Sequence, residues 1–143
     1  EEDIIEEEKK IAKAAAKLTY AFANATVPKV NLIVGKAYGS AYISMNSKHI
    51  GADMVFALPN AEIATMDSNL AAQIMYSDED KDLIKEKARE YADLNSSANS
   101  AARRGYIDSI IEAETVRKHM IYSFEMLFTK RESRPEKKHG SLL

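Results

Sequence analysis

The segment 30–44, VNLIVGKAYGSAYIS, constrains the fold of this chain more than any other. Residues 30–34 are apolar apart from Asn31 and rich in β-branched side chains, which predicts a buried strand. Residues 35–39 contain two glycines and are expected to form a loop. Residues 40–48 predict a short helix, which Gly51 would end. The stretch therefore predicts a strand, a turn of small residues and a helix.

The rest of the chain continues this alternation, which favours an α/β layered domain with crossover helices. Further helices are expected over 1–25, 68–76, 81–94 and 114–130, and further strands over 53–57, 62–66 and 106–111. Ser68 or Asn69 is expected to cap the helix that ends at Tyr76. Residues 96–104 are small and polar and are assigned no element, and the basic tail 131–143 is expected to be irregular.

Composition excludes several classes of function. The 143 residues suffice for one domain, and the net charge of −2 leaves no basic excess for nucleic acid. Cysteine is absent, which excludes disulfides and thiolate chemistry and fits a cytoplasmic location. No apolar run approaches the ~20 residues that span a bilayer. Because the chain begins inside a predicted helix and shows few strands, we expect a piece of a longer protein, truncated at its N-terminus.

The small residues at the end of the first strand have two interpretations. Small side chains let a ligand approach the backbone, and the first turn of the following helix carries unpaired N–H groups that bind anions and stabilise a developing oxyanion. A tight, well-packed turn explains the same residues without any ligand. From the pattern alone, the packing interpretation is favoured.

Other candidate sites are weaker. Ser40 does not lie in a G-x-S-x-G motif, because Tyr42 and Ile43 follow where a glycine would be needed, and no histidine is placed by the sequence to activate it. His49 and Asp53 are separated by a glycine, so no metal site is expected.

Charged residues elsewhere also allow two readings. Glu62 and Asp67 could be paired carboxylates, although their spacing does not require it. Arg103 and Arg104 could bind an anion or face solvent, and solvent is favoured. The basic tail could contact phosphate, and a solvated arm or a docking segment explains it equally well.

An ordered set of motifs identifies a family. TVPK, KAYGSAY, SKH, GAD, P-x-AEI, RGYID and RP-x-KKHG follow one another in the chain. Together they closely resemble the C-terminal domain of β-type carboxyltransferase subunits of biotin-dependent acyl-CoA carboxylases, such as the propionyl-CoA carboxylase β chain. Methylmalonyl-CoA and glutaconyl-CoA decarboxylases use similar subunits. The resemblance covers most of the chain from about residue 16 onward.

This resemblance implies a crotonase-like fold, a superhelix of ββα units, with residues 1–143 forming part of the C-terminal carboxyltransferase domain. It implies transfer of a carboxyl group between carboxybiotin and the α-carbon of an acyl-CoA. Biotin would arrive on a separate carboxyl carrier domain, and the coenzyme A thioester would be the substrate. The N-terminal CoA-binding half is absent from this chain. Family members assemble as trimers of dimers, so a homo-oligomer is expected.

The resemblance also implies the site residues. The family's Tyr-Gly-Gly-Ala-Tyr matches Tyr38, Gly39, Ser40, Ala41 and Tyr42, which would bind biotin, with the backbone N–H groups of Ser40 and Ala41 as the oxyanion hole. The donor at position 40 survives the change to serine if the φ angle there is negative.

Ile43 matches a position that lines the acyl pocket.

Three hypotheses remain for the chain. It is part of a carboxylase subunit, part of a subunit of a sodium-pumping decarboxylase, or an inactive domain that only assembles with partners.

Overall fold

Two small parallel sheets organise the chain. The structure, a computed structural model, describes residues 2–134, with side chains described from residue 10 onward. The strands are β1 (Val30–Ile33), β2 (Lys36–Tyr38), β3 (Met54–Ala57), β4 (Glu62–Ala64) and β5 (Ser109–Ile110). The helices are α1 (Glu2–Asn24), α2 (Gly39–Ser44), α3 (Ser68–Met75), α4 (Lys81–Tyr91), α5 (Ala98–Arg103) and α6 (Val116–Met126).

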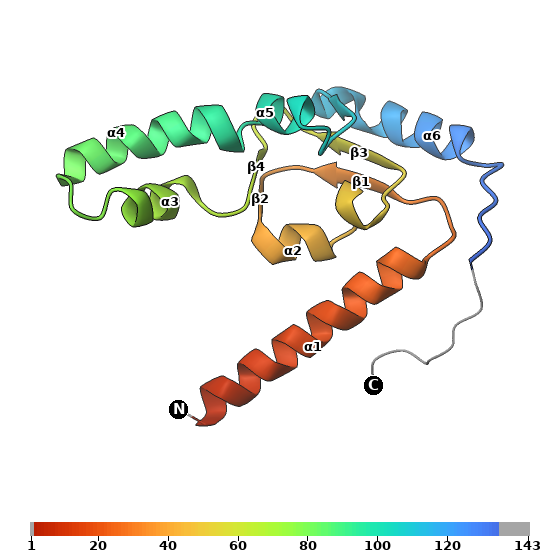
Figure 1. The fold of residues 1–143 in the computed structure, drawn as a ribbon. Coiled ribbons are helices and arrows are strands. Elements are labelled where there is room, and N and C mark those ends of the chain that lie inside the picture. Colours follow the sequence, from red (N-terminus) through yellow and green to blue (C-terminus); the bar gives the residue numbers. More distant parts are fainter. Residues whose placement is uncertain (1, 135–143) are drawn as a thin grey trace.

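The sheet topology repeats one unit. One sheet has the order β1-β3-β5 and the other pairs β2 with β4, all in parallel. The chain passes from β1 directly to β2 and then to α2, and from β3 to β4 and then to α3. Each pass therefore adds one strand to each sheet and a helix, which is a ββα unit. Figure 1 shows how these units stack.

Small apolar side chains fill the space between the sheets and helices. Val55 and Ala57 of β3 are completely buried, and Ile63 of β4 is 2% exposed. Ala98 and Ala101 of α5 belong to the same cluster, because their small side chains let this helix approach closely. The core thus joins both sheets to α5 and to the end of β2, where the candidate site lies.

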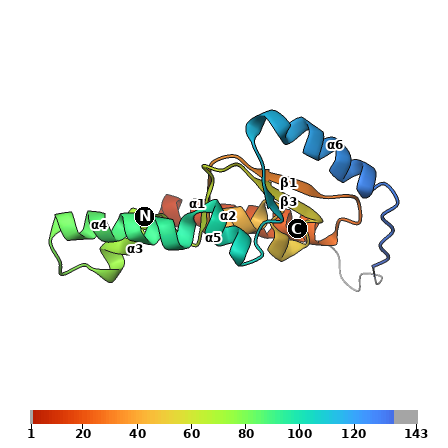
Figure 2. The same ribbon diagram turned by 90° about the horizontal axis from the view of Figure 1, so that it is seen from above.

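The helices differ in how much of their surface they bury. α6 lies over the three-stranded sheet, and α3 and α4 form a hairpin that extends away from the sheets (Figure 2). α1 packs against α2 through the C-terminal part of the helix, where Thr19 Oγ1 donates to Ser44 Oγ at 3.0 Å. Further towards its N-terminus, Ile11 is 64% exposed.

Two predictions around the first strand need correction. Residues 36–38 were expected in a loop but form β2, because the chain leaves the first sheet at Gly35 and pairs with β4, with Lys36 opposite Glu62. The helix predicted over 40–48 ends at Ser44. Asn46 then adopts a left-handed φ of 57°, which an α-helix cannot continue through.

Two further corrections concern helix starts. The side chain of Asp67, rather than Ser68 or Asn69, caps α3 by accepting from the N–H groups of Asn69 (2.9 Å) and Leu70 (3.4 Å). Residues 96–104, assigned no element, contain α5, whose cap is the Ser97 hydroxyl. Serine and alanine are too small to give the periodic apolar signal that reveals a helix. The motif RP-x-KKHG lies mostly outside the described residues.

Candidate active site

The turn between β2 and α2 requires a glycine at position 39. Gly39 has a φ of 58°, and a Cβ there would lie 3.1 Å from the carbonyl oxygen of Thr65. Both the backbone conformation and the close approach therefore disfavour a side chain. Among the described residues, Asn46 is the only non-glycine residue with a positive φ. Ser40 thus keeps an ordinary backbone conformation, and the serine is not strained.

The N-terminus of α2 is left open by its own chain. Tyr38, the N-cap residue, is extended (φ −118°, ψ 143°), and its side chain does not cap the helix. The N–H groups of the first turn of a helix have no acceptor within the helix. The N–H groups of Ser40 and Ala41, which the sequence predicted as donors, belong to this first turn. The end of the helix also carries the positive part of the helix dipole.

A pocket of about 270 Å³ lies beside this turn. This volume is near the lower end of the ~300–1,000 Å³ typical of small-molecule sites. Four of its lining residues come from the predicted segment: Gly39, Ser40, Tyr42 and Ile43. The rest come from later in the chain: His49, 63–65, Tyr91, Asn95, Arg104 and Tyr106. Parts of α2, β4, α4 and the residues after α5 therefore meet at this hollow.

Aromatic side chains form one wall of the pocket. Tyr42 is 9% exposed, and its ring meets that of His49 edge to face at 5.9 Å between centroids. The rings of His49 and Tyr106 lie 4.8 Å apart. The hydroxyl of Tyr42 is buried without a hydrogen-bond partner among the described residues. Burial, with a smaller contribution from Tyr106, raises the pKa of Tyr42, so this hydroxyl stays protonated and can donate.

Two of the predicted residues do not line the pocket. The side chain of Tyr38 turns to Glu62, to which its hydroxyl donates a hydrogen bond. Burial and this hydrogen bond raise the pKa of Tyr38. Ala41 does not line the hollow either, and only its N–H group was predicted to act. The Nζ of Lys36 lies 4.0 Å from Glu62 Oε2 and 3.9 Å from Asp67 Oδ2, so the two carboxylates share one lysine.

Sequence reasoning missed the far wall of the pocket. Arg104 is exposed, as expected, but it also lines the hollow, and its Nη2 donates to Asn95 Oδ1 at 2.7 Å. Asn95 itself lies in a π-helical turn, Ala92–Ser96, which follows α4. The motif RGYID, which contains Arg104 and Tyr106, was the one signal in the sequence that pointed to this wall.

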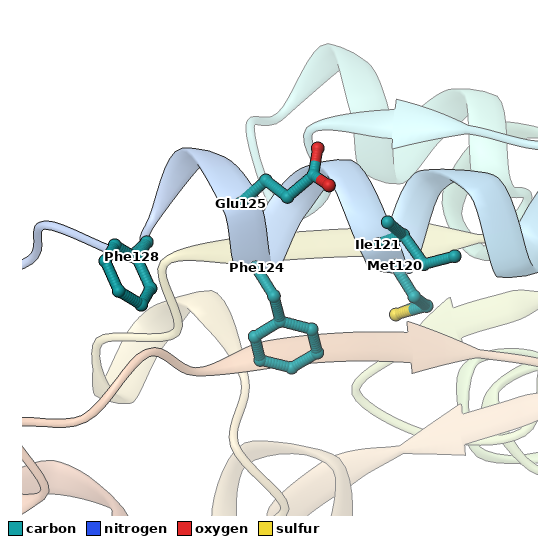
Figure 3. A pocket seen from close by; sticks show the side chains of 5 residues that line it. All are labelled: Met120, Ile121, Phe124, Glu125 and Phe128. Carbon is teal, nitrogen blue, oxygen red and sulfur yellow. The ribbon is translucent and has the colours of Figure 1, made fainter.

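A larger hollow, of about 640 Å³, lies along α6 and does not resemble a catalytic site. It is lined by Met120, Ile121, Phe124, Glu125 and Phe128, which all come from this helix and the turn after it. Figure 3 shows Phe124 pointing to one side of the helix and the carboxylate of Glu125 to the other. No backbone donor or second element contributes to it. We therefore place the candidate active site at the smaller pocket.

Within residues 2–134, no group of three or more His, Asp or Glu residues is arranged to hold a metal ion. In the same residues, no helix is both long enough and apolar enough to cross a membrane.

With this geometry established, comparison with known proteins gives the class of protein. The model of the carboxyl transferase domain family matches residues 5–142. The chain therefore belongs to the carboxyl transferase domain family, which confirms the resemblance found in the motifs.

Individual relatives extend this result. The methylmalonyl-CoA decarboxylase subunit alpha of Propionigenium modestum is 45% identical over 92% of this chain, and the propionyl-CoA carboxylase beta chain of Saccharopolyspora erythraea is 44% identical over 92%. A crystal structure of transcarboxylase 12S, a hexamer with hydrolysed methylmalonyl-coenzyme A bound, superimposes with a TM-score of 0.88 at 39% identity, over 95% of this chain. The predicted crotonase-like fold is thereby confirmed.

The matched region is a limited part of each relative. The chain spans 27% of the decarboxylase subunit, 26% of the carboxylase beta chain and 27% of the transcarboxylase 12S chain.

Proposed function

We propose that this chain supplies the biotin-side half of a carboxyltransferase site that acts on acyl-CoA thioesters. The observation that carries the proposal is the uncapped N-terminus of α2, which opens beside a pocket at the position where the family motif places its oxyanion hole. The substrate class follows from relatives that are acyl-CoA carboxylase and decarboxylase subunits.

The residues present fit a biotin ring. Gly39 leaves room that a Cβ would fill, and the pocket offers N–H donors next to aromatic walls, which suit a flat ureido group with one polar oxygen. Biotin, when bound, would supply a ureido nitrogen that takes the carboxyl group as the bond from that group to the α-carbon breaks, and the proton of that nitrogen would pass to the α-carbon.

The chain's own groups contribute electrostatics and position. The N–H groups of Ser40 and Ala41 donate to an oxygen whose negative charge grows as the carboxyl moves, and donors fixed in advance need no reorganisation at that moment. Gly39 allows the ligand to approach this backbone. Tyr42 forms the wall beside the donors, and Ile43 is exposed at the edge of the pocket where it would limit the acyl group.

The partners and location are part of the same proposal. We infer a biotin carboxyl carrier domain as the partner that brings the cofactor, a CoA-binding half as the complement of this site, and a homo-oligomer arranged as a trimer of dimers. The hexameric transcarboxylase 12S supports the oligomer. Residues 1–143 would then be part of the C-terminal carboxyltransferase domain, in a cytoplasmic enzyme.

A transfer assay on the full-length subunit that contains this sequence tests the proposal. The purified subunit is mixed with free biotin and with methylmalonyl-CoA or malonyl-CoA, and the formation of the decarboxylated acyl-CoA is followed. We expect turnover that depends on biotin. Absence of turnover with every acyl-CoA tested would contradict the proposal and favour a domain that only assembles with partners.

The decarboxylase alternative keeps the same site residues. Identity to the decarboxylase subunit (45%) and to the carboxylase beta chain (44%) is nearly equal, and the two directions share one transition state. Co-purification with membrane-embedded subunits would favour the sodium-pumping decarboxylase.

A further inference from the structure

Arg104 is an exposed cationic side chain that lines the pocket and has no carboxylate partner among the described residues. It lines the hollow together with Ser40 and Tyr42, and no Asp or Glu lies within 4.0 Å of its guanidinium among the side chains that the structure describes. Its neighbour Arg103 lines none of the hollows described above. Both arginines are exposed, and of the two only Arg104 borders the pocket.

Asn95 holds the guanidinium in place. Arg104 Nη2 donates to Asn95 Oδ1 at 2.7 Å, and Nη1 donates to the carbonyl oxygen of Asn95 at 3.4 Å. A guanidinium carries five N–H donors, so three remain uncommitted. The π-helical turn Ala92–Ser96 brings Asn95 to this position, and such turns occur frequently at functional sites. The local fold thus orients an arginine whose charge is not neutralised.

The rest of the pocket wall also favours an anion. No Asp or Glu lines the hollow, whereas the open N–H groups of α2 begin at its edge. The planar fork of a guanidinium matches a carboxylate, with which it forms two parallel hydrogen bonds. A carboxylate is also the one anion that must enter this site if the chain transfers carboxyl groups.

We propose that Arg104 binds the carboxylate of the carboxyl group in transfer, and that Asn95 positions the guanidinium for it. This inference rests on the proposed function. The contact forms with the bound substrate and persists during transfer, so it lowers KM more than it raises kcat. Arg104 would therefore distinguish a carboxylated acyl-CoA from its decarboxylated product.

Binding measurements on the full-length subunit test this inference. The affinities for methylmalonyl-CoA and propionyl-CoA are measured by calorimetry, alongside KM and kcat for decarboxylation. Arg104→Gln should weaken methylmalonyl-CoA binding on the order of tenfold or more and leave propionyl-CoA within about twofold, because only the former carries the carboxylate. Arg104→Lys keeps the positive charge but not the planar guanidinium, so it should lose less affinity for methylmalonyl-CoA than Arg104→Gln. Arg103→Gln is the matched control and should change neither affinity.

Two variants of Asn95 separate positioning from folding. Asn95→Ala releases the guanidinium, whereas Asn95→Asp places a carboxylate beside it that competes with the substrate. Asn95→Asp should therefore raise KM for methylmalonyl-CoA more than Asn95→Ala, although both remove the same amide.

The possible outcomes are distinct. If the wild type turns over and Arg104→Gln weakens the affinities for both ligands equally, or weakens neither, this inference is overturned. The proposed function is then unaffected. Absence of turnover and of binding in the wild type would overturn the proposed function, and this inference with it.

Discussion

The two strands of the smaller sheet lead into helices that begin in opposite ways. After β4, the side chain of Asp67 occupies the N-terminus of α3 and accepts from Asn69 and Leu70. After β2, no side chain occupies the N-terminus of α2. α4 and α6 also begin without a side-chain cap, so what sets α2 apart is the pocket that lies beside its first turn. We propose that this first turn serves a ligand.

A second difference supports this interpretation. The turn into α2 passes through a left-handed glycine, Gly39, with Thr65 close against it, and it borders a pocket lined by residues from several parts of the fold. α3 has no comparable turn, and its exposed side belongs to a hairpin with α4 that extends away from the sheets (Figure 1). We therefore propose that the same succession of strand and helix serves structure in one unit and chemistry in the other.

The largest effect is expected at the open turn. Gly39→Ala forces a Cβ into a left-handed conformation 3.1 Å from Thr65 O, which should lower the free energy of unfolding by about 1–2 kcal/mol. The shift needed to relieve the contact moves the N–H donors, so biotin-dependent transfer should fall by about 10²-fold or more. Urea unfolding and the transfer assay measure the two effects.

Gly35→Ala is the matched control for this change. No atom lies within 4 Å of a Cβ at Gly35, and its φ is outside the left-handed region. We expect little change in either measurement. Equal loss in the two variants would remove the special role of the turn at Gly39.

At the closed helix end, the effect should be on stability alone. Asp67→Ala removes the cap and should lower Tm by about 2–5 °C without reducing transfer, whereas Asp67→Asn keeps an acceptor and should lose less. Thermal unfolding followed by circular dichroism measures the change. Loss of transfer in Asp67→Ala would show that α3 also serves the site.

The pH dependence of this cap has a defined sign. The N–H of Asn69 holds the pKa of Asp67 below its ordinary value, against a smaller opposing effect of desolvation. The ionised cap therefore contributes fully above the unfolded-state pKa of about 3.9 and is lost as the pH falls through the lowered folded-state pKa. In Asp67→Asn, the part of the fall in Tm at acid pH that comes from protonation of Asp67 should be absent.

The smallest effect is expected on the buried side of α2. Tyr42→Phe removes a buried hydroxyl that has no partner among the described residues, so the free energy of unfolding should stay the same or rise by up to about 1 kcal/mol. Chemical denaturation of the two proteins gives this difference. A clear loss of stability would show that the hydroxyl is hydrogen-bonded in solution, through water or another group.

The sequence predicted most elements that have a strong apolar period. α1, β1, β3 and β4 lie close to their predicted ranges because β-branched strands and long amphipathic helices are visible locally. β2 was missed because its partner, β4, lies far along the chain, and the pairing of Lys36 with Glu62 is not a local property. α5 was missed because it is built from alanine and serine.

The candidate site was predictable on one side only. The family motif identified residues 38–43, and the structure shows that Gly39 rather than Ser40 takes the positive φ. Asn95, Arg104 and Tyr106 reach the pocket through the π-helical turn and the core packing of α5, which no local pattern reveals. Arg104 is exposed, as its sequence context predicts, and only the fold shows that it also borders the pocket.

Replacement of a single backbone amide by an ester tests the role of the open helix end most directly. Lactic acid in place of Ala41 removes one N–H group of α2 and changes no side chain. Lactic acid in place of Ala71 is the control, because the N–H of Ala71 already donates to the carbonyl oxygen of Asp67 at 2.9 Å within α3.

We expect the ester at position 41 to lower biotin-dependent transfer by about 10²–10³-fold with little change in Tm. The ester at position 71 should lower Tm and leave transfer nearly intact. Unchanged transfer with the ester at position 41 would contradict a role for this N–H group in the reaction.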